Sequence, residues 1–270
     1  MKCAKFGLVV VAVVTMAVLA PTVRADWIPG MSAKWVQMPD LSTTGMDVNA
    51  TWKSPNAFPY IKVLADDFLC TSTEPITDVH IWGSWLNDMV NPDVTFKLSI
   101  HSDIPAGVGG LNYSQPGQLL WQQIFSPGEY VQRPWAIAPE QFFEPNTNQI
   151  IGFDTQVFQY NFFIPRDKAF VQQGSATNGV VYWLDVTAIL PAESPEVFGW
   201  KTSVDHWNDD AVFGDALVNP MVPPELWRRL VNPLTGQSMD LSFVITPEPA
   251  TMALLGLGAF GLVARRRNKK

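Results

Sequence analysis

Cysteine and basic residues are both scarce in the body of this 270-residue chain. Cys3 precedes the first apolar run and Cys70 ends another, so no internal disulfide is expected and Cys70 is predicted to be a buried, inert thiol. Of the 18 basic residues, three lie before residue 26 and five after residue 264, so residues 26–246 carry 10 basic against 24 acidic residues, a net charge of −14. Such a surface repels nucleic acid, and no nucleic-acid partner is expected.

Catalytic signatures are also missing. The sequence has no GxSxG elbow and no HExxH motif, and its three histidines (80, 101 and 206) are widely spaced. Gly83-Ser84 fits a tight strand feature better than a nucleophile. A glycosidase needs only two carboxylates, but among so many acids no pair stands out. We predict that the protein is not an enzyme, with a polysaccharide hydrolase or lyase as a weaker alternative.

The N-terminus has the pattern of an export signal. Lys2 and Lys5 precede an apolar run over 6–20, and Val23-Arg24-Ala25 ends in a small residue that suits signal peptidase. Residues 1–25 are therefore predicted to be a Sec-type signal peptide, cut before Asp26. An N-terminal membrane helix fits less well because the apolar run is short.

The C-terminus has three parts in a fixed order. Pro247-Glu248-Pro249 precedes an uncharged apolar segment, 250–264, and then a basic tail, 265–270. A helix of that apolar length reaches about 22 Å, short of the roughly 30 Å hydrocarbon core, although snorkelling arginines cover part of the difference. Because basic residues stay in the cytoplasm, everything before Pro247 is expected to lie outside. A plain C-terminal membrane anchor is the alternative.

This order resembles the PEP-CTERM sorting signal of Gram-negative bacteria, over residues 246–270. The resemblance implies transient membrane insertion through the C-terminal helix and recognition of Pro247, Glu248 and Pro249 by an exosortase, which cuts the tail. It also implies export through the inner membrane to the cell surface or the extracellular space. Similar proteins are typical of bacteria that make extracellular polysaccharide, which makes such a polymer a candidate partner.

Between the two signals, residues 26–246 read as one all-β domain. In the segment 93–101, apolar Val94, Phe96, Leu98 and Ile100 alternate with polar residues, as in an antiparallel strand with one buried face. Turn-forming segments separate the runs, so we predict a β-sandwich, jelly-roll-like. The predicted strands cover 60–70, 76–86, 93–101, 118–125, 149–160, 179–189 and 239–245.

The same domain resembles an uncharacterised family of exported bacterial β-domain proteins that often carry the same tail. The resemblance spans most of residues 33–246 and supports a single domain, but it implies no activity or site. The segments that carry it are ADDFLC (65–70), ITDVHIWGSW (76–85), LSIHSDIPAG (98–107) and GWKTSVDHWNDDAVFGD (199–215).

The densest polar cluster is an acidic loop near residue 210. Grouped carboxylate and amide oxygens suit a hard cation such as Ca²⁺, but the spacing does not match an EF-hand, and solvated turn caps are the simpler interpretation. No other cofactor is expected. Asp66 and Asp67 are further donors from elsewhere in the fold. The candidate metal ligands of the loop are Asp205, Asn208, Asp209, Asp210 and Asp215.

All 11 tryptophans fall inside the exported domain. Flat aromatic rings stack on sugars, but most tryptophans in a sandwich are core residues. Trp200 and Trp207 flank the acidic loop and are the candidates for ligand stacking.

We therefore expect a non-catalytic protein of the cell surface or extracellular matrix, structural or adhesive in role, with a carbohydrate-binding module, assisted by Ca²⁺, as the alternative.

Overall fold

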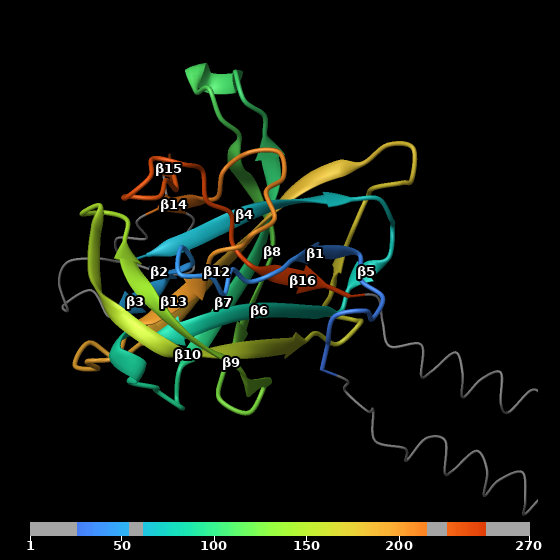
Figure 1. Ribbon diagram of the computed structural model, residues 1–270. Coiled ribbons are helices and arrows are strands. Elements are labelled where there is room, and N and C mark those ends of the chain that lie inside the picture. The colour runs from blue at the N-terminus through green and yellow to red at the C-terminus, as the bar shows by residue number, and fades with distance from the viewer. Residues whose placement is uncertain (1–25, 54–61, 215–225, 247–270) are drawn as a thin grey trace, which may run out of the picture. The chain divides into compact units, whose positions relative to one another are not determined.

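The computed structural model describes residues 26–53, 62–214 and 226–246, and most of their regular elements are β-strands (Figure 1). The prediction of an all-β sandwich is confirmed. The helical segments in these ranges are two short 3-10 turns, η1 (Leu86–Asp88) and η2 (Val108–Gly110). Within the same ranges no helix is long and apolar enough to cross a membrane. The predicted signal peptide and the sorting tail, including Pro247, Glu248 and Pro249, lie outside the described residues.

One seven-stranded sheet, here called the curled sheet, follows the order β1-β16-β6-β10-β9-β2-β13, with a further pairing of β13 with β6. Its two longest strands form a hairpin, while β2 pairs in parallel with β9. The strands are β1 (Trp35–Gln37), β2 (Met46–Asn49), β6 (Asp78–Trp85), β9 (Tyr130–Glu144), β10 (Gln149–Phe163), β13 (Phe198–Lys201) and β16 (Phe243–Ile245).

The second sheet, here called the open sheet, follows the order β15-β14-β4-β12-β7-β8, and β3 pairs in parallel with the end of β12. A small separate pair joins β5 (Pro75–Ile76) to β11 (Phe170–Val171). The open-sheet strands are β3 (Thr51–Lys53), β4 (Val63–Cys70), β7 (Thr95–Ile104), β8 (Gln115–Phe125), β12 (Val180–Leu190), β14 (Val212–Gly214) and β15 (Trp227–Arg229).

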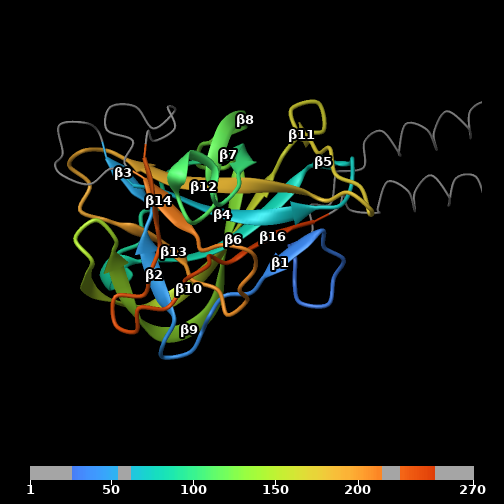
Figure 2. The ribbon, with the colours of Figure 1, turned by 90° about the horizontal axis from the view of Figure 1, so that it is seen from above.

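The main core lies between the two sheets, which stack as layers in Figure 2. Phe96 is at its centre, with ring centroids of Tyr130, Tyr160, Phe162 and Phe198 at 5.0–5.4 Å. Edge-to-face aromatic pairs contribute about 0.5–1.5 kcal/mol each beyond their area burial. The alternation predicted for 93–101 is confirmed, since Phe96, Leu98 and Ile100 all point into this core.

The polar side of the same strand is buried as well. Lys97, Ser99 and His101 alternate with the core residues and have exposed fractions of 0–1 %. A second apolar cluster, which includes Trp183 and Trp227, covers that side of the open sheet. Both faces of the sheet are therefore shielded, which is unusual for an antiparallel sheet and forces its polar residues to find partners inside the protein.

Candidate functional site

Five strands of the curled sheet form a closed ring: β6, β10, β9, β2 and β13 pair in turn, and β13 returns to β6. The closure uses one edge of β6 twice, with β16 on Val79–Ile81 and β13 on Gly83–Trp85. One face of the ring points into the main core. The opposite face is enclosed, so side chains on it are removed from water although they are not part of the apolar core.

Two glycines lie where the ring closes. A Cβ at Gly83 would lie 2.3 Å from the carbonyl oxygen of Gly199 and 2.4 Å from the ring of Phe198. A Cβ at Gly199 would lie 2.8 Å from both Asp47 and the ring of Phe142. Because β6 and β13 approach so closely, only a residue without a side chain fits at either position. These glycines therefore permit the closure that encloses the polar face.

The enclosed face holds a carboxylate cluster, which consists of Asp47, Glu140, Asp154 and Lys201. The strand register assembles it, because Asp47 lies directly opposite Lys201 across β2 and β13, and Glu140 lies opposite Asp154 across β9 and β10. All four residues have exposed fractions of 0–2 %. Oxygen atoms of the three acids all lie within 4.8 Å of one another, and no other such group of acids, histidines or cysteines occurs in the part of the chain that the structure describes.

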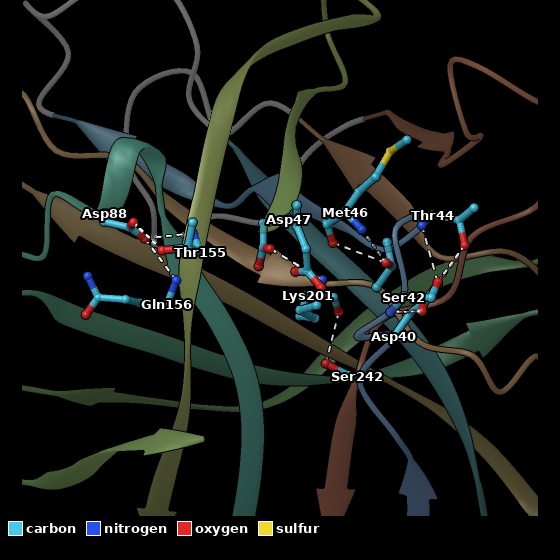
Figure 3. Close-up of polar contacts among 12 residues, drawn as sticks. Asp40, Ser42, Thr44, Met46, Asp47, Asp88, Thr155, Gln156, Lys201 and Ser242 are labelled. Atoms are coloured by element: carbon cyan, nitrogen blue, oxygen red, sulfur yellow. Dashed lines mark hydrogen bonds and ion pairs between the residues drawn. The ribbon is translucent and has the colours of Figure 1, made fainter. Parts of the chain in front are cut away.

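Lys201 supplies the positive charge of this cluster. Its Nζ contacts Oε2 of Glu140 and lies 3.5 Å from Oδ2 of Asp47, a contact drawn in Figure 3. Four other oxygens of the cluster accept no hydrogen bond of ordinary geometry from a described residue: both of Asp154, Oδ1 of Asp47 and Oε1 of Glu140. The carboxyl groups of Asp47 and Glu140 are nevertheless close enough to affect each other's pKa. Ser84 Oγ on β6 is also buried and makes no hydrogen bond of ordinary geometry to a described residue. It lies close enough to Asp47 and Asp154 to oppose in part the rise in their pKa values that burial causes.

A β-bulge lies beside Asp154 of the cluster. The β9–β10 register shifts there because two residues of β9 lie opposite Thr155 of β10, and Asp88 from η1 binds Thr155 (Figure 3). Oδ1 of Asp88 accepts the backbone N–H groups of Thr155 and Gln156 at 2.8 and 2.9 Å, and Oδ2 accepts the Thr155 hydroxyl at 2.6 Å. These bonds hold the pKa of Asp88 below its usual value, against a burial effect that raises it. Asp88 therefore fixes the backbone of β10 directly after Asp154, opposite the bulge in β9.

Burial dominates the electrostatics of the cluster. It raises the pKa of Asp154 to about 9 and, despite the neighbouring Lys201, that of Glu140 to about 8. The pKa of Asp47 is raised by burial too. Burial alone would lower the pKa of Lys201, but the carboxylates of Asp47 and Glu140 outweigh it and raise that pKa instead. At neutral pH, then, the ammonium persists and the cluster retains protons on its acids.

The open sheet holds a second buried lysine in a different setting. Lys97 Nζ lies 2.9 Å from Oδ1 of Asp185, and Nε2 of His101 lies 2.7 Å from Oδ2 of the same carboxylate. All three side chains are buried. Burial raises the pKa of Asp185, but Lys97 and His101 outweigh it, so the net pKa lies below the usual value. This group, here called the Lys97 group, pairs one carboxylate with the Lys97 ammonium and the His101 ring.

The described residues of the acidic loop do not converge on one point. Oδ2 of Asp205 accepts the backbone N–H of Met38, and Oδ2 of Asp209 accepts that of Ser114. Asp210 pairs with Arg229 and accepts the hydroxyl of Ser238.

Among the described candidate ligands, Asn208 does meet Asp67: its amide N–H donates to Oδ2 of Asp67. Burial raises the pKa of the Asp67 carboxyl to about 8. Asp215 lies outside the described residues.

The two candidate stacking residues have opposite surroundings. Trp200 is fully buried, and its indole N–H donates to the carbonyl oxygen of Ser242 at 2.8 Å, so it has no face for a ligand. Trp207 is half-buried at the surface and packs edge-to-face against Trp35, with ring centroids 5.0 Å apart. A role of Trp207 in ligand stacking stays a prediction.

Sequence reasoning missed the whole carboxylate cluster. Its residues are far apart in the chain and follow no motif spacing. One local signal was present: an acid inside a strand-like apolar run, as Asp154 is in the run 149–160, is a candidate for a buried, functional carboxylate.

Comparisons with known proteins identify two regions. Residues 33–246 match the family described as Domain of unknown function (DUF7901), and residues 246–267 match the PEP-CTERM protein-sorting motif. The sorting motif makes this an exported protein that is anchored in the membrane during sorting to the cell surface and is processed by an exosortase. Neither a curated protein nor a solved structure matches the chain. Because the first match covers most of its length, the chain belongs to the DUF7901 family.

Proposed function

We propose that the protein is a non-catalytic component of the cell surface or extracellular matrix, with a structural or adhesive role. The observation that carries this proposal is the direct connection between the β-domain and its sorting signal. β16 ends at Ile245 within the curled sheet, beside β6, and the sorting motif begins at residue 246. The β-domain is thus tied to its sorting signal by a strand of its own sheet, without a spacer.

The settings of the titratable groups support a non-catalytic role. His80 is buried between Asn161 and Asp78, and His101 belongs to the Lys97 group. Glu140 and Asp154, two acids with strongly raised pKa values, sit on the enclosed face of the curled sheet, where a polymer has no access. A polysaccharide hydrolase needs two carboxylates in an open cleft that flank the scissile bond.

One observation favours the carbohydrate-binding alternative. Trp207 is half-buried against Trp35, and the exposed side chains of Asp205 and His206 lie next to it in sequence. Aromatic faces of this kind stack on sugar rings, and nearby polar groups supply hydrogen bonds. This surface would give an adhesive protein its contact with extracellular polysaccharide.

The exported protein, recovered from the surface fraction of its host, tests both proposals. We expect no new reducing ends after incubation with the host's extracellular polysaccharide, and co-sedimentation of the protein with that polymer. Trp207→Ala should weaken co-sedimentation at least several-fold if the sugar surface is correct, while the matched change Trp121→Ala, at another half-buried tryptophan, should not. Release of reducing ends by the wild type would overturn the non-catalytic proposal.

A further inference from the structure

The carboxylate cluster has the donor set of a cation site. Carboxylate oxygens within 4.8 Å of one another can surround one ion, because hard divalent cations bind oxygen at about 2.0–2.6 Å and opposite ligands are then separated by roughly twice that distance. The set has no histidine or cysteine, which disfavours zinc and the softer metals. We propose that Asp47, Glu140 and Asp154 bind one divalent, oxygen-preferring cation on the enclosed face of the curled sheet.

Unpaired oxygens point to a ligand as an observation independent of the acidic residues themselves. Asp154 is 1 % exposed, and neither of its oxygens accepts a hydrogen bond from the described part of the chain. A buried acceptor left unpaired costs roughly 1–3 kcal/mol, more when it is charged, so native proteins rarely keep several together. Here six oxygens without a hydrogen bond of ordinary geometry meet, two each from Asp154 and Glu140 and one each from Asp47 and Ser84, and of these only Oε2 of Glu140 contacts the Lys201 ammonium among the described residues.

Charge balance supports a divalent ion. Three carboxylates and the Lys201 ammonium leave two negative charges in a site with almost no exposure to solvent. One divalent cation cancels them. The alternative is two protons, in agreement with the raised pKa values of Glu140 and Asp154, and a metal ion would displace those protons as it binds.

Lys201 does not compete for the same atoms. It contacts Oε2 of Glu140 and Oδ2 of Asp47, whereas the unpaired oxygens of these residues are Oε1 and Oδ1. The lysine therefore orients two of the acids and leaves their other oxygens for the ion. Asp88 is the corresponding positioning residue for Asp154, because its hydrogen bonds fix the backbone of the next two residues, Thr155 and Gln156.

Enclosure favours Ca²⁺ over Mg²⁺. Mg²⁺ usually keeps several bound waters, whereas Ca²⁺ accepts irregular cages of carboxylates and other protein oxygens. A site whose residues are 0–2 % exposed has little room for waters of hydration. The enclosure also means that the ion enters while the ring closes during folding, so release to a chelator should be slow.

The test uses the full chain, unfolded with EDTA and refolded with millimolar Ca²⁺, Mg²⁺ or Mn²⁺, or with no metal. We expect about one Ca²⁺ per chain by elemental analysis after desalting, and a higher melting temperature with Ca²⁺ than without. Asp154→Asn should lose both effects while circular dichroism shows retained β-structure. The matched control Asp205→Asn changes an acid of the exposed loop and should retain both.

Binding of Mg²⁺ or Mn²⁺ in preference to Ca²⁺ would support the site and change its occupant. Wild-type protein that carries no more of any of these metals than Asp154→Asn does would overturn the proposal. So would loss of the ion in Asp205→Asn with retention in Asp154→Asn, because the ion would then belong to the loop. If Asp154→Asn does not fold, the metal content of the wild type still decides. Metal content is independent of surface display, so this result leaves the proposed function intact.

Discussion

Lys97 in the open sheet and Lys201 in the curled sheet are both buried next to acids, and their settings differ in charge balance. In the open sheet, Lys97 shares the single carboxylate of Asp185 with His101. In the curled sheet, Lys201 is surrounded by three carboxylates. Burial is almost complete in both, yet the pKa of Asp185 is lowered while those of the curled-sheet acids are raised.

The comparison shows that the ratio of charges, and not burial alone, decides what a buried ionic group can do. When the positive side chains balance the charge of the carboxylate, the group needs no further ion or proton once the chain has folded. When carboxylates are in excess, protons or a metal ion must complete it. The Lys97 group therefore has the character of a structural element, and the carboxylate cluster that of a binding site.

The largest expected effect is that of Asp185→Asn. This change leaves Lys97 and His101 buried without their counter-charge, and breaking a buried pair in this way costs about 3–5 kcal/mol. Glu140→Gln, in metal-free protein, removes one acid from an excess and should change the free energy of unfolding by less than about 1.5 kcal/mol. Urea unfolding of both variants provides the measurement. Equal losses would show that charge balance does not distinguish the two groups.

The pH dependence of stability should have opposite sign in the two groups. The ordinary pKa values of aspartate and glutamate side chains are 3.8 and 4.5, and burial raises those of Asp154 and Glu140 to about 9 and about 8 in the folded protein. Between these limits the folded state retains protons that the unfolded chain has released, so stability of the metal-free protein falls as pH rises from about 4 to about 9. The lowered pKa of Asp185 acts in the other direction, and its contribution is lost only as pH falls below about 4.

Unfolding curves of metal-free protein from pH 5 to pH 8 separate these contributions. Asp154→Asn removes one titrating group, so the decline of stability with pH should become shallower, by at most about 1.4 kcal/mol per pH unit. A matched substitution in the other sheet, Asp185→Asn, should instead lower stability throughout this range, because it removes the partner of the buried Lys97. If Asp154→Asn has the wild-type slope, the acid does not hold its proton in the folded state.

Much of the sandwich could be predicted because the central strands of the open sheet are long and rich in apolar residues. The predicted strands 60–70, 93–101 and 179–189 correspond to β4, β7 and β12. The 15-residue β9 was missed because it contains Pro134 and Pro139, and proline usually marks an edge or a break. Here the β9–β10 register shifts near both prolines, so bulges absorb the missing N–H donors.

The carboxylate cluster could not be predicted for a related reason. Asp47 and Lys201 lie on β2 and β13, strands of four residues each, and Glu140 lies on the missed β9. Only Asp154 is in a predicted strand. The four residues meet because β13 closes onto β6, a long-range pairing that depends on two glycines and leaves no periodic signal.

Asp88→Asn tests whether the contacts of Asp88 with the backbone after Asp154 control Ca²⁺ binding by the cluster. The amide retains one acceptor oxygen, so the variant keeps part of the contacts to Thr155 and Gln156 and should lose about 1–2 kcal/mol of stability. Ca²⁺ binding should weaken by roughly tenfold, as for other residues that orient metal ligands. Asp167→Asn, at an exposed acid, is the control and should match the wild type when bound Ca²⁺ is measured after refolding over a range of Ca²⁺ concentrations. Unaltered Ca²⁺ affinity in Asp88→Asn would mean that Asp154 holds its position without the contacts of Asp88.

The smallest effect is expected from two serines that occupy corresponding positions. Ser84 faces Asp47 and Asp154 in the curled sheet, and Ser99 lies opposite Asp185 in the open sheet. Both hydroxyls are buried without a hydrogen bond to the described residues, so either change to alanine should alter metal-free stability by less than about 1 kcal/mol. With Ca²⁺ present the two should diverge, because Ser84→Ala removes a neutral ligand of the ion and Ser99→Ala removes nothing that the paired Lys97 group needs. Melting curves with and without Ca²⁺ measure that divergence, and identical Ca²⁺ shifts in the two variants would exclude Ser84 from the ion's coordination.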